Sequence, residues 1–167
     1  MELFTTVDVI GQGLPLLLPK GTKIIQKMQR WIEDLEDNEW GYMRTKTPLM
    51  AKSDLYKISG HWDHYKDNMY TTMIDEEDYA VKPMNCPGGM LVYKSEPRSY
   101  KDLPLRMGEL GLVHRHEKSG ALHGLFRVRC FTQDDAHLFM TPDQLKDEIK
   151  NTVRLFDEVY SVFNLPY

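Results

Sequence analysis

Residues 106–139 read RMGELGLVHRHEKSGALHGLFRVRCFTQDDAHLF, and this pattern predicts two strands joined by a loop. The second half indicates one extended strand from residue 126, because side chains with functional groups alternate with a second set that is apolar at its start. The alternating row consists of Arg127, Arg129, Phe131, Gln133, Asp135 and His137. Residues 110–117 form a second strand-like run, with Arg115 and Glu117 on one face. An antiparallel hairpin through residues 118–125 would place those two side chains beside the row.

The flanking sequence predicts both helices and strands. Residues 22–39 have the apolar spacing of an amphipathic helix, and residues 42–50 read as a strand that carries Pro48. Residues 69–74 and 79–84 predict a hairpin around an acidic turn, and residues 85–89 predict a capped strand-to-helix junction. A capping sequence at 141–144, with Pro at the first helical position, predicts a long helix to about residue 163.

Composition limits the class of protein. A chain of 167 residues with 41% hydrophobic content can bury a core and is expected to form one domain. The formal charge of −4 and the pI near 5.9 exclude a strongly basic nucleic-acid footprint over the whole chain. Two cysteines fit a reducing compartment, and the longest apolar run, residues 14–18, is far too short for a membrane span. We therefore expect a cytoplasmic protein with no membrane partner.

Two groups of residues suggest ligands. Arg115, Arg127 and Arg129 could hold a polyphosphate, since guanidinium groups match phosphate oxygens; they could equally pair with Glu117, Asp134 and Asp135. Phe131 lies in line with them and could stack on a base or pack in the core. Cys86 and His137 are acceptable zinc ligands, but their wide spacing alone is a weak signal. The chain has neither a Walker loop nor a G-x-G-x-x-G sequence, so a nucleotide would use another cradle.

Several of these segments resemble a known family. Residues 113–117 with 126–129 resemble motif 2 of the class II aminoacyl-tRNA synthetases, and residues 22–49 resemble motif 1. More narrowly, KPMNCPG at 82–88, RVRCFTQDDAH at 127–137, GHWDHY at 60–65 and YKDLPLR at 100–106 are similar to the threonyl-tRNA synthetase family. The resemblance covers nearly the whole chain. It implies an α+β fold with an antiparallel sheet flanked by helices, and ATP-dependent activation of threonine before transfer to tRNA(Thr).

The resemblance also implies roles for individual residues. Arg115 would hold the α-phosphate and Arg127 the γ-phosphate of a Mg²⁺-bound ATP, as the two catalytic side chains. Glu117 would accept from the adenine amino group, Phe131 would stack on the adenine, and Met84 would line that pocket. Gln133 would contact threonine, and Asp135 would accept from its hydroxyl group. Cys86 and His137 would be two of three protein ligands to a zinc ion.

Some features depart from the family pattern. His116, Gly89 and Cys130 replace the usual Asn, His and Gly, and Cys130 is expected to pack and not to bind metal. The third zinc ligand, motif 3 and the anticodon-binding domain would lie after residue 167. The editing domain would lie before residue 1. Residues 1–167 are thus expected to be the N-terminal part of a catalytic domain, with doubtful activity alone and a homodimer contact through motif 1. The alternatives are a non-catalytic module that binds ATP or a partner, and a prolyl- or seryl-tRNA synthetase relative.

Overall fold

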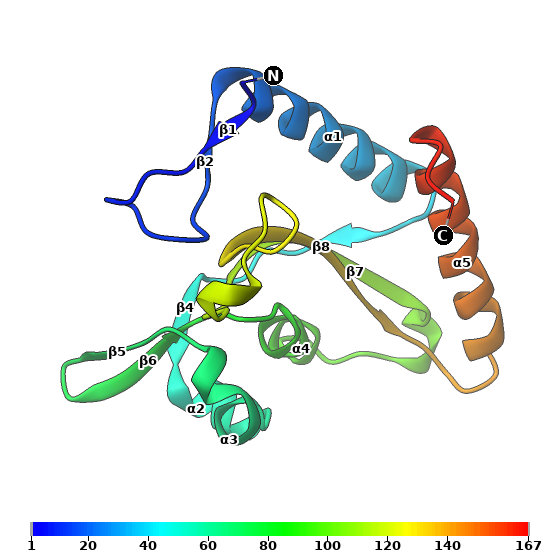
Figure 1. The fold of residues 1–167 in the computed structure, drawn as a ribbon. Helices are drawn as coiled ribbons and strands as arrows, with labels where there is room; N and C mark the ends of the chain where they lie inside the picture. The colour runs from blue at the N-terminus through cyan, green and yellow to red at the C-terminus, as the bar shows by residue number, and fades with distance from the viewer. Residues whose placement is uncertain (1, 167) are drawn as a thin grey trace.

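The computed structural model describes residues 2–166, which form five α-helices and eight short or medium strands within that range (Figure 1). The helices are α1 Pro19–Asn38, α2 Ser53–Ile58, α3 His61–Tyr65, α4 Cys86–Lys94 and α5 Leu145–Val162. The strands are β1 Phe4–Thr5, β2 Leu16–Leu17, β3 Met43–Arg44, β4 Met50–Lys52, β5 Thr71–Ile74, β6 Glu77–Val81, β7 Leu105–His114 and β8 Cys130–Phe139. This mixture confirms the predicted α+β class.

The antiparallel hairpin of β7 and β8 is the centre of the molecule. Ten residue pairs run from Leu105 opposite Phe139 to His114 opposite Cys130, which confirms the predicted pairing. The bounds differ from the prediction, because β8 begins at Cys130 and β7 ends at His114. The intervening residues form a loop held by its own contacts and by the N-terminal segment, where the Arg129 N–H donates to the Gly13 carbonyl. Arg115, Glu117, Arg127 and Arg129 therefore all lie outside the ladder.

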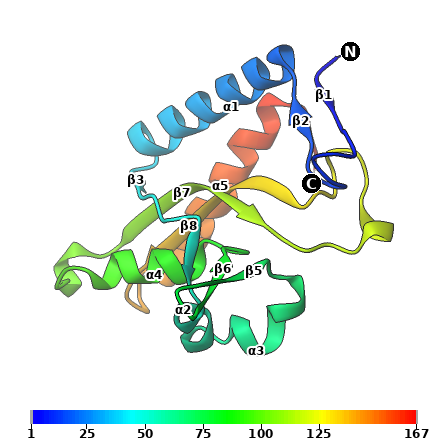
Figure 2. The ribbon, with the colours of Figure 1, turned by 90° about the vertical axis from the view of Figure 1, so that its left-hand side faces the viewer.

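Helices flank this hairpin. In both views α1 lies above the hairpin and α4 below it, and α5 packs against its side (Figures 1 and 2). The short strand β3 runs parallel to β7, so this sheet is antiparallel except for that edge. A cluster of Leu35, Tyr42 and Leu155, packed by Trp40 and Leu138, joins α1, α5 and β8.

The remaining elements form a smaller unit beneath the hairpin. Strands β4, β6 and β5 make a second antiparallel sheet, and its hairpin turns at Asp75 and Glu76, both with positive φ. Tyr56, Met69 and Ala80 form its core. The predicted hairpin around an acidic turn is confirmed. The predicted strand at 42–50 is in fact two short pieces, β3 and β4, because Pro48 and its neighbours link two different sheets.

Three helix starts differ from the predictions. Helix α1 begins at Pro19 and not at residue 22. Helix α5 begins at Leu145, so Gln144, and not Thr141, is the residue before its first turn. The Gln144 side chain accepts a hydrogen bond from the Thr141 N–H and donates one to the Leu103 carbonyl. Helix α4 follows Asn85, but the Asn85 side chain does not cap it. Within residues 2–166, every helix is too short or too polar to cross a membrane.

Candidate functional site

One face of β8 carries four of the residues predicted for the site. The alternation places Phe131, Gln133, Asp135 and His137 on the same side of the strand, where all four are half-buried. Between them, Thr132, Asp134 and Ala136 are exposed. The contacts of Asp135 and His137 with residues at the start of α4 show that this face points toward α4.

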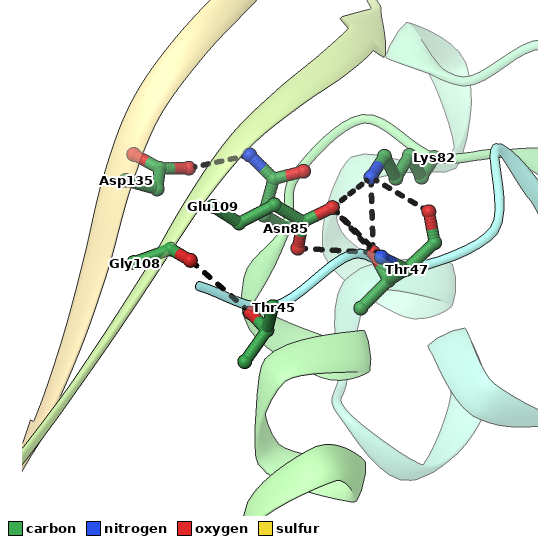
Figure 3. Close-up of polar contacts among 7 residues, drawn as sticks. All are labelled: Thr45, Thr47, Lys82, Asn85, Gly108, Glu109 and Asp135. Carbon is green, nitrogen blue, oxygen red and sulfur yellow. Dashed lines mark hydrogen bonds and ion pairs between the residues drawn. The ribbon is translucent and has the colours of Figure 1, made fainter. Parts of the chain in front are cut away.

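The segment 82–85 approaches that face and is fixed by a buried ion pair. The Lys82 ammonium lies 2.8 Å from Glu109 Oε1 of β7, with side-chain exposures of 6% and 4%. Thr47 completes the group, since its hydroxyl lies 2.9 Å from both the lysine Nζ and Glu109 Oε1 (Figure 3). Excellent geometry and extra hydrogen bonds are what a buried ion pair requires. The start of α4 is thereby anchored to the central hairpin.

Asn85 links this segment to β8. Its Nδ2 donates to Asp135 Oδ2 at 2.8 Å, and the residue has 0% exposure (Figure 3). Its carboxamide lies directly over Gly111 of β7, so that a Cβ at position 111 would overlap it. The backbone of β7 must therefore be bare at Gly111 for Asn85 to reach Asp135.

The two predicted zinc ligands converge on the first turn of α4. Cys86 is its first residue, and the His137 ring lies so close that a Cβ on Gly89 would be 2.9 Å from Nδ1. Burial raises the pKa of the Cys86 thiol, the charge of Asp135 raises it further, and Arg115 opposes the shift. Among residues 2–166, however, no three His, Cys, Asp or Glu side chains form a group that could hold a metal ion.

The predicted phosphate-binding arginines have separate environments. Arg115 donates from Nε to the Pro83 carbonyl at 3.0 Å, and its guanidinium lies 5.2 Å from the centre of the Phe131 ring. Arg127 pairs with Glu117 at 2.9 Å, and the Arg129 Nε donates to the Glu117 carbonyl. Arg127 and Arg129 are not on a common strand face with Phe131, so that part of the prediction is wrong. The carboxylate partner foreseen for them in the alternative is found for Arg127 only.

Met84 lies at the edge of the site. Its sulfur is 3.1 Å from His61 Nε2, and it lines a cavity of about 330 Å³ with Thr47, Tyr56 and Pro87. The described residues that line this cavity do not include Arg115, Glu117 or Phe131. Met84 therefore lines a cavity that the other residues proposed to bind ATP do not line.

Two features of the site were missed by the sequence analysis. The Lys82–Glu109 pair could have been suspected, because each charge sits in or next to an apolar strand, where an unpaired charge is very unfavourable. The Asn85–Asp135 bond carried no such signal, because an Asn before a helix has the pattern of a cap.

Comparisons with known proteins agree with this fold. Residues 70–167 match the family model described as tRNA synthetase class II core domain (G, H, P, S and T). The chain is 58% identical over 167 residues to a threonine–tRNA ligase of Syntrophomonas wolfei, of which it covers 26%. A solved threonyl-tRNA synthetase RNA-binding domain from Cryptosporidium parvum is 37% identical with a TM-score of 0.91, covering 95% of this chain and 40% of that one. A putative threonyl-tRNA synthetase of Aeropyrum pernix is 33% identical with a TM-score of 0.89, covering 99% and 39%.

The hairpin, the anchored segment before α4 and the family match together define a class II aminoacyl-tRNA synthetase core, and the chain belongs to that family. Within the family its relatives at 54–58% identity are threonine–tRNA ligases. The prolyl or seryl alternative is not favoured. The chain spans about a quarter of the length of the curated relatives it matches.

Proposed function

We propose that this chain forms the part of a threonine–tRNA ligase catalytic domain that binds ATP and selects threonine. The observation that carries the proposal is the convergence of Asp135, His137 and Arg115 on the start of α4. A carboxylate, an imidazole, a thiol and a guanidinium there offer partners for an amino alcohol and for the phosphate beside it. The reaction would be attack of the threonine carboxylate on the α-phosphorus of ATP, which releases pyrophosphate and forms threonyl-adenylate.

Threonine selection would depend on its hydroxyl group. An apolar pocket cannot strongly separate threonine from isosteric valine, whereas buried polar partners are left unsatisfied when valine enters. Asp135 would accept from the hydroxyl, and Gln133 would contact the amino acid. Gln133 Oε1 supports this role, because it is buried without a hydrogen-bond partner among the described residues. Serine also carries a hydroxyl, so this site would reject it weakly.

The donor set at α4 fits zinc in part. Cys86 and His137 are a thiol and an imidazole, which zinc prefers, and the third ligand is not found among residues 2–166. A zinc ion held there would supply Lewis-acid ligation of the threonine amino and hydroxyl groups. The raised pKa of Cys86 means that zinc must displace a proton from the thiol, so zinc affinity would rise with pH.

ATP, together with Mg²⁺, would bind near the loop that joins β7 and β8. Arg115, held by the Pro83 carbonyl, would stabilise charge that develops on the α-phosphate. Glu117 would accept from the adenine amino group and Arg127 would reach the γ-phosphate, so their mutual ion pair must open when ATP binds. Phe131 would exchange its contact with Arg115 for stacking on adenine. Met84 would border the ATP site from the neighbouring cavity that it lines.

The proposed partners are ATP, threonine and tRNA(Thr), with a homodimer contact through motif 1. Exposed apolar side chains on α1, including Ile24 and Met28, support that contact. We also propose that residues 1–167 correspond to the N-terminal part of the catalytic domain.

Threonine-dependent ATP–pyrophosphate exchange tests the proposal. It should be measured with added zinc on the 167-residue chain and on the full-length protein that carries this sequence, with valine and serine for comparison. The full-length protein should prefer threonine to valine strongly, and Asp135→Asn should lower that preference by about 10- to 100-fold. A full-length protein that binds ATP but shows no exchange would identify a non-catalytic module instead.

A further inference from the structure

We propose that Asn85 is a positioning residue that fixes the Asp135 carboxylate for threonine selection. The inference rests on the proposed function, in which Asp135 accepts from the threonine hydroxyl, and adds a residue that acts through it. Neither the composition of the strand-to-helix junction nor its helix requires an asparagine here, since the Asn85 side chain makes no capping bond.

The first argument is the direction of the side chain. Asn85 turns away from α4 and toward β8, where its Nδ2 lies 2.8 Å from Asp135 Oδ2 (Figure 3). The orientation of the amide follows from chemistry, because an ionised carboxylate only accepts hydrogen bonds and a flipped amide would set oxygen against oxygen. The bond occupies one oxygen of Asp135 and so restricts rotation of the carboxylate.

The second argument is that the fit is tight. Asn85 has no exposed surface, and its carboxamide fills the space that a side chain at position 111 would need. A fully buried amide costs stability unless it is paired, yet Asn85 Oδ1 has no partner among the described residues. A side chain kept for stability alone would satisfy both ends. One satisfied donor aimed at Asp135 points to a requirement of the site.

The third argument is the anchoring of the backbone. Three residues before Asn85, Lys82 is clamped to Glu109 of β7, and Glu109 is the register partner of Asp135. On the other side, the Asn85 carbonyl accepts from the Gly89 N–H in the first turn of α4. Asn85 is thus held on one side against β7, the strand that pairs with β8, and on the other side by the first turn of α4. These two attachments fix the backbone from which the amide reaches Asp135.

The consequence for selection is geometric. A carboxylate that is free to rotate would spend less time aimed at the hydroxyl, and threonine would lose binding that valine never had. Losing the bond should therefore weaken threonine recognition while leaving ATP recognition intact. A purely structural role would instead affect both substrates through a less stable protein.

The test uses Asn85→Ala in the full-length protein, with exchange kinetics for threonine, valine and ATP, zinc content and melting temperature. We expect KM for threonine and the threonine-to-valine ratio of kcat/KM to worsen by about 10- to 100-fold, as for loss of a hydrogen bond to a charged group. KM for ATP and zinc content should stay within about twofold. Gln144→Ala removes amide hydrogen bonds to Thr141 and Leu103, neither of which belongs to the site, so it is the control and should lower only stability.

A swapped pair separates positioning from folding. Asn85→Asp alone places two carboxylates together and should lower both stability and threonine preference. Asn85→Asp with Asp135→Asn restores a donor–acceptor pair, so the melting temperature should recover while threonine preference stays lost. Unchanged selectivity in Asn85→Ala, or zinc loss that accounts for its defect, would overturn the inference alone. No threonine exchange in the unmodified full-length protein would overturn the proposed function and the inference with it.

Discussion

Lys82 and Glu109 form an ion pair from which solvent is almost excluded, and Thr47 donates to the carboxylate from its backbone N–H and its hydroxyl. Desolvation of two charges costs several kcal/mol, so such a pair contributes to stability only while both members are present. Its main effect is on position, because the ion pair and the hydrogen bond from the His114 N–H to the Lys82 carbonyl hold the segment before α4 against β7. Asn85 lies three residues further along that segment and contacts Asp135.

Removal of one member should be far more harmful than removal of an exposed lysine. Lys82→Met leaves Glu109 charged and buried, and we expect a loss of about 3 kcal/mol or more in the free energy of unfolding, measured by urea denaturation. Lys52→Met is the matched control, because its ion pair with Glu77 is half exposed, and its effect should be much smaller. Equal losses in the two variants would show that the buried pair has no special role.

Secondary structure elements were predicted well where a hydrophobic repeat continued over many residues. They were predicted poorly where tertiary contacts set their bounds. The apolar stripes of α1 and α5 and the alternation in β8 gave the correct element types. The start of β8 was missed, because the Arg129 N–H pairs with Gly13, more than a hundred residues away, a contact that alternation cannot show. Asp135 and His137 do contact residues at the start of α4, where Cys86 is the first helical residue, whereas Arg127 lies in the loop.

Helix α5 shows that an apolar stripe need not be equally buried along its length. Leu155 is 4% exposed and packs on Leu35 and Tyr42, while Ile149, on the same helix, is 57% exposed. Leu155→Ala should therefore cost about 2–5 kcal/mol, and Ile149→Ala should change stability by about 0.5 kcal/mol or less. Urea unfolding of the 167-residue chain measures both. A large cost at Ile149 would mean that its face is covered, for example by a second copy of the chain.

At the scale of the whole molecule, Arg44 ties three elements together. From β3 it contacts Glu36 of α1 at 2.7 Å and Asp134 of β8 at 3.7 Å. Burial, and then the charge of Asp134, raises the pKa of Glu36 to about 7, although Arg44 opposes the shift. The Asp134 side chain is 33% exposed, and the covering of the rest is the main reason why the pKa of its carboxyl is also raised. The contact between α1 and the hairpin is therefore most stable when the Glu36–Asp134 pair carries a proton.

The sign of the resulting pH dependence is fixed by linkage. The folded state binds the Glu36 proton more tightly than the unfolded state, so its contribution is complete below the ordinary pKa of 4.5 and is lost as pH rises to about 7. Glu36→Gln should remove this contribution, which has a slope of at most about 1.4 kcal/mol per pH unit. Between pH 4.5 and 7, the urea midpoint of the chain should fall relative to that of the variant. Above pH 7, the two midpoints should follow parallel curves. Parallel curves from pH 4.5 to 7 would contradict the prediction.

The close contact between Gly111 and Asn85 restricts how both positions can change during evolution. Because the Asn85 carboxamide occupies the volume of a side chain at position 111, the two positions cannot mutate independently. A lineage that acquired alanine at 111 would have to abandon the asparagine first, and with it the grip on Asp135. An alignment of relatives should then show the two positions changing together, and an ancestor with one change alone should be rare.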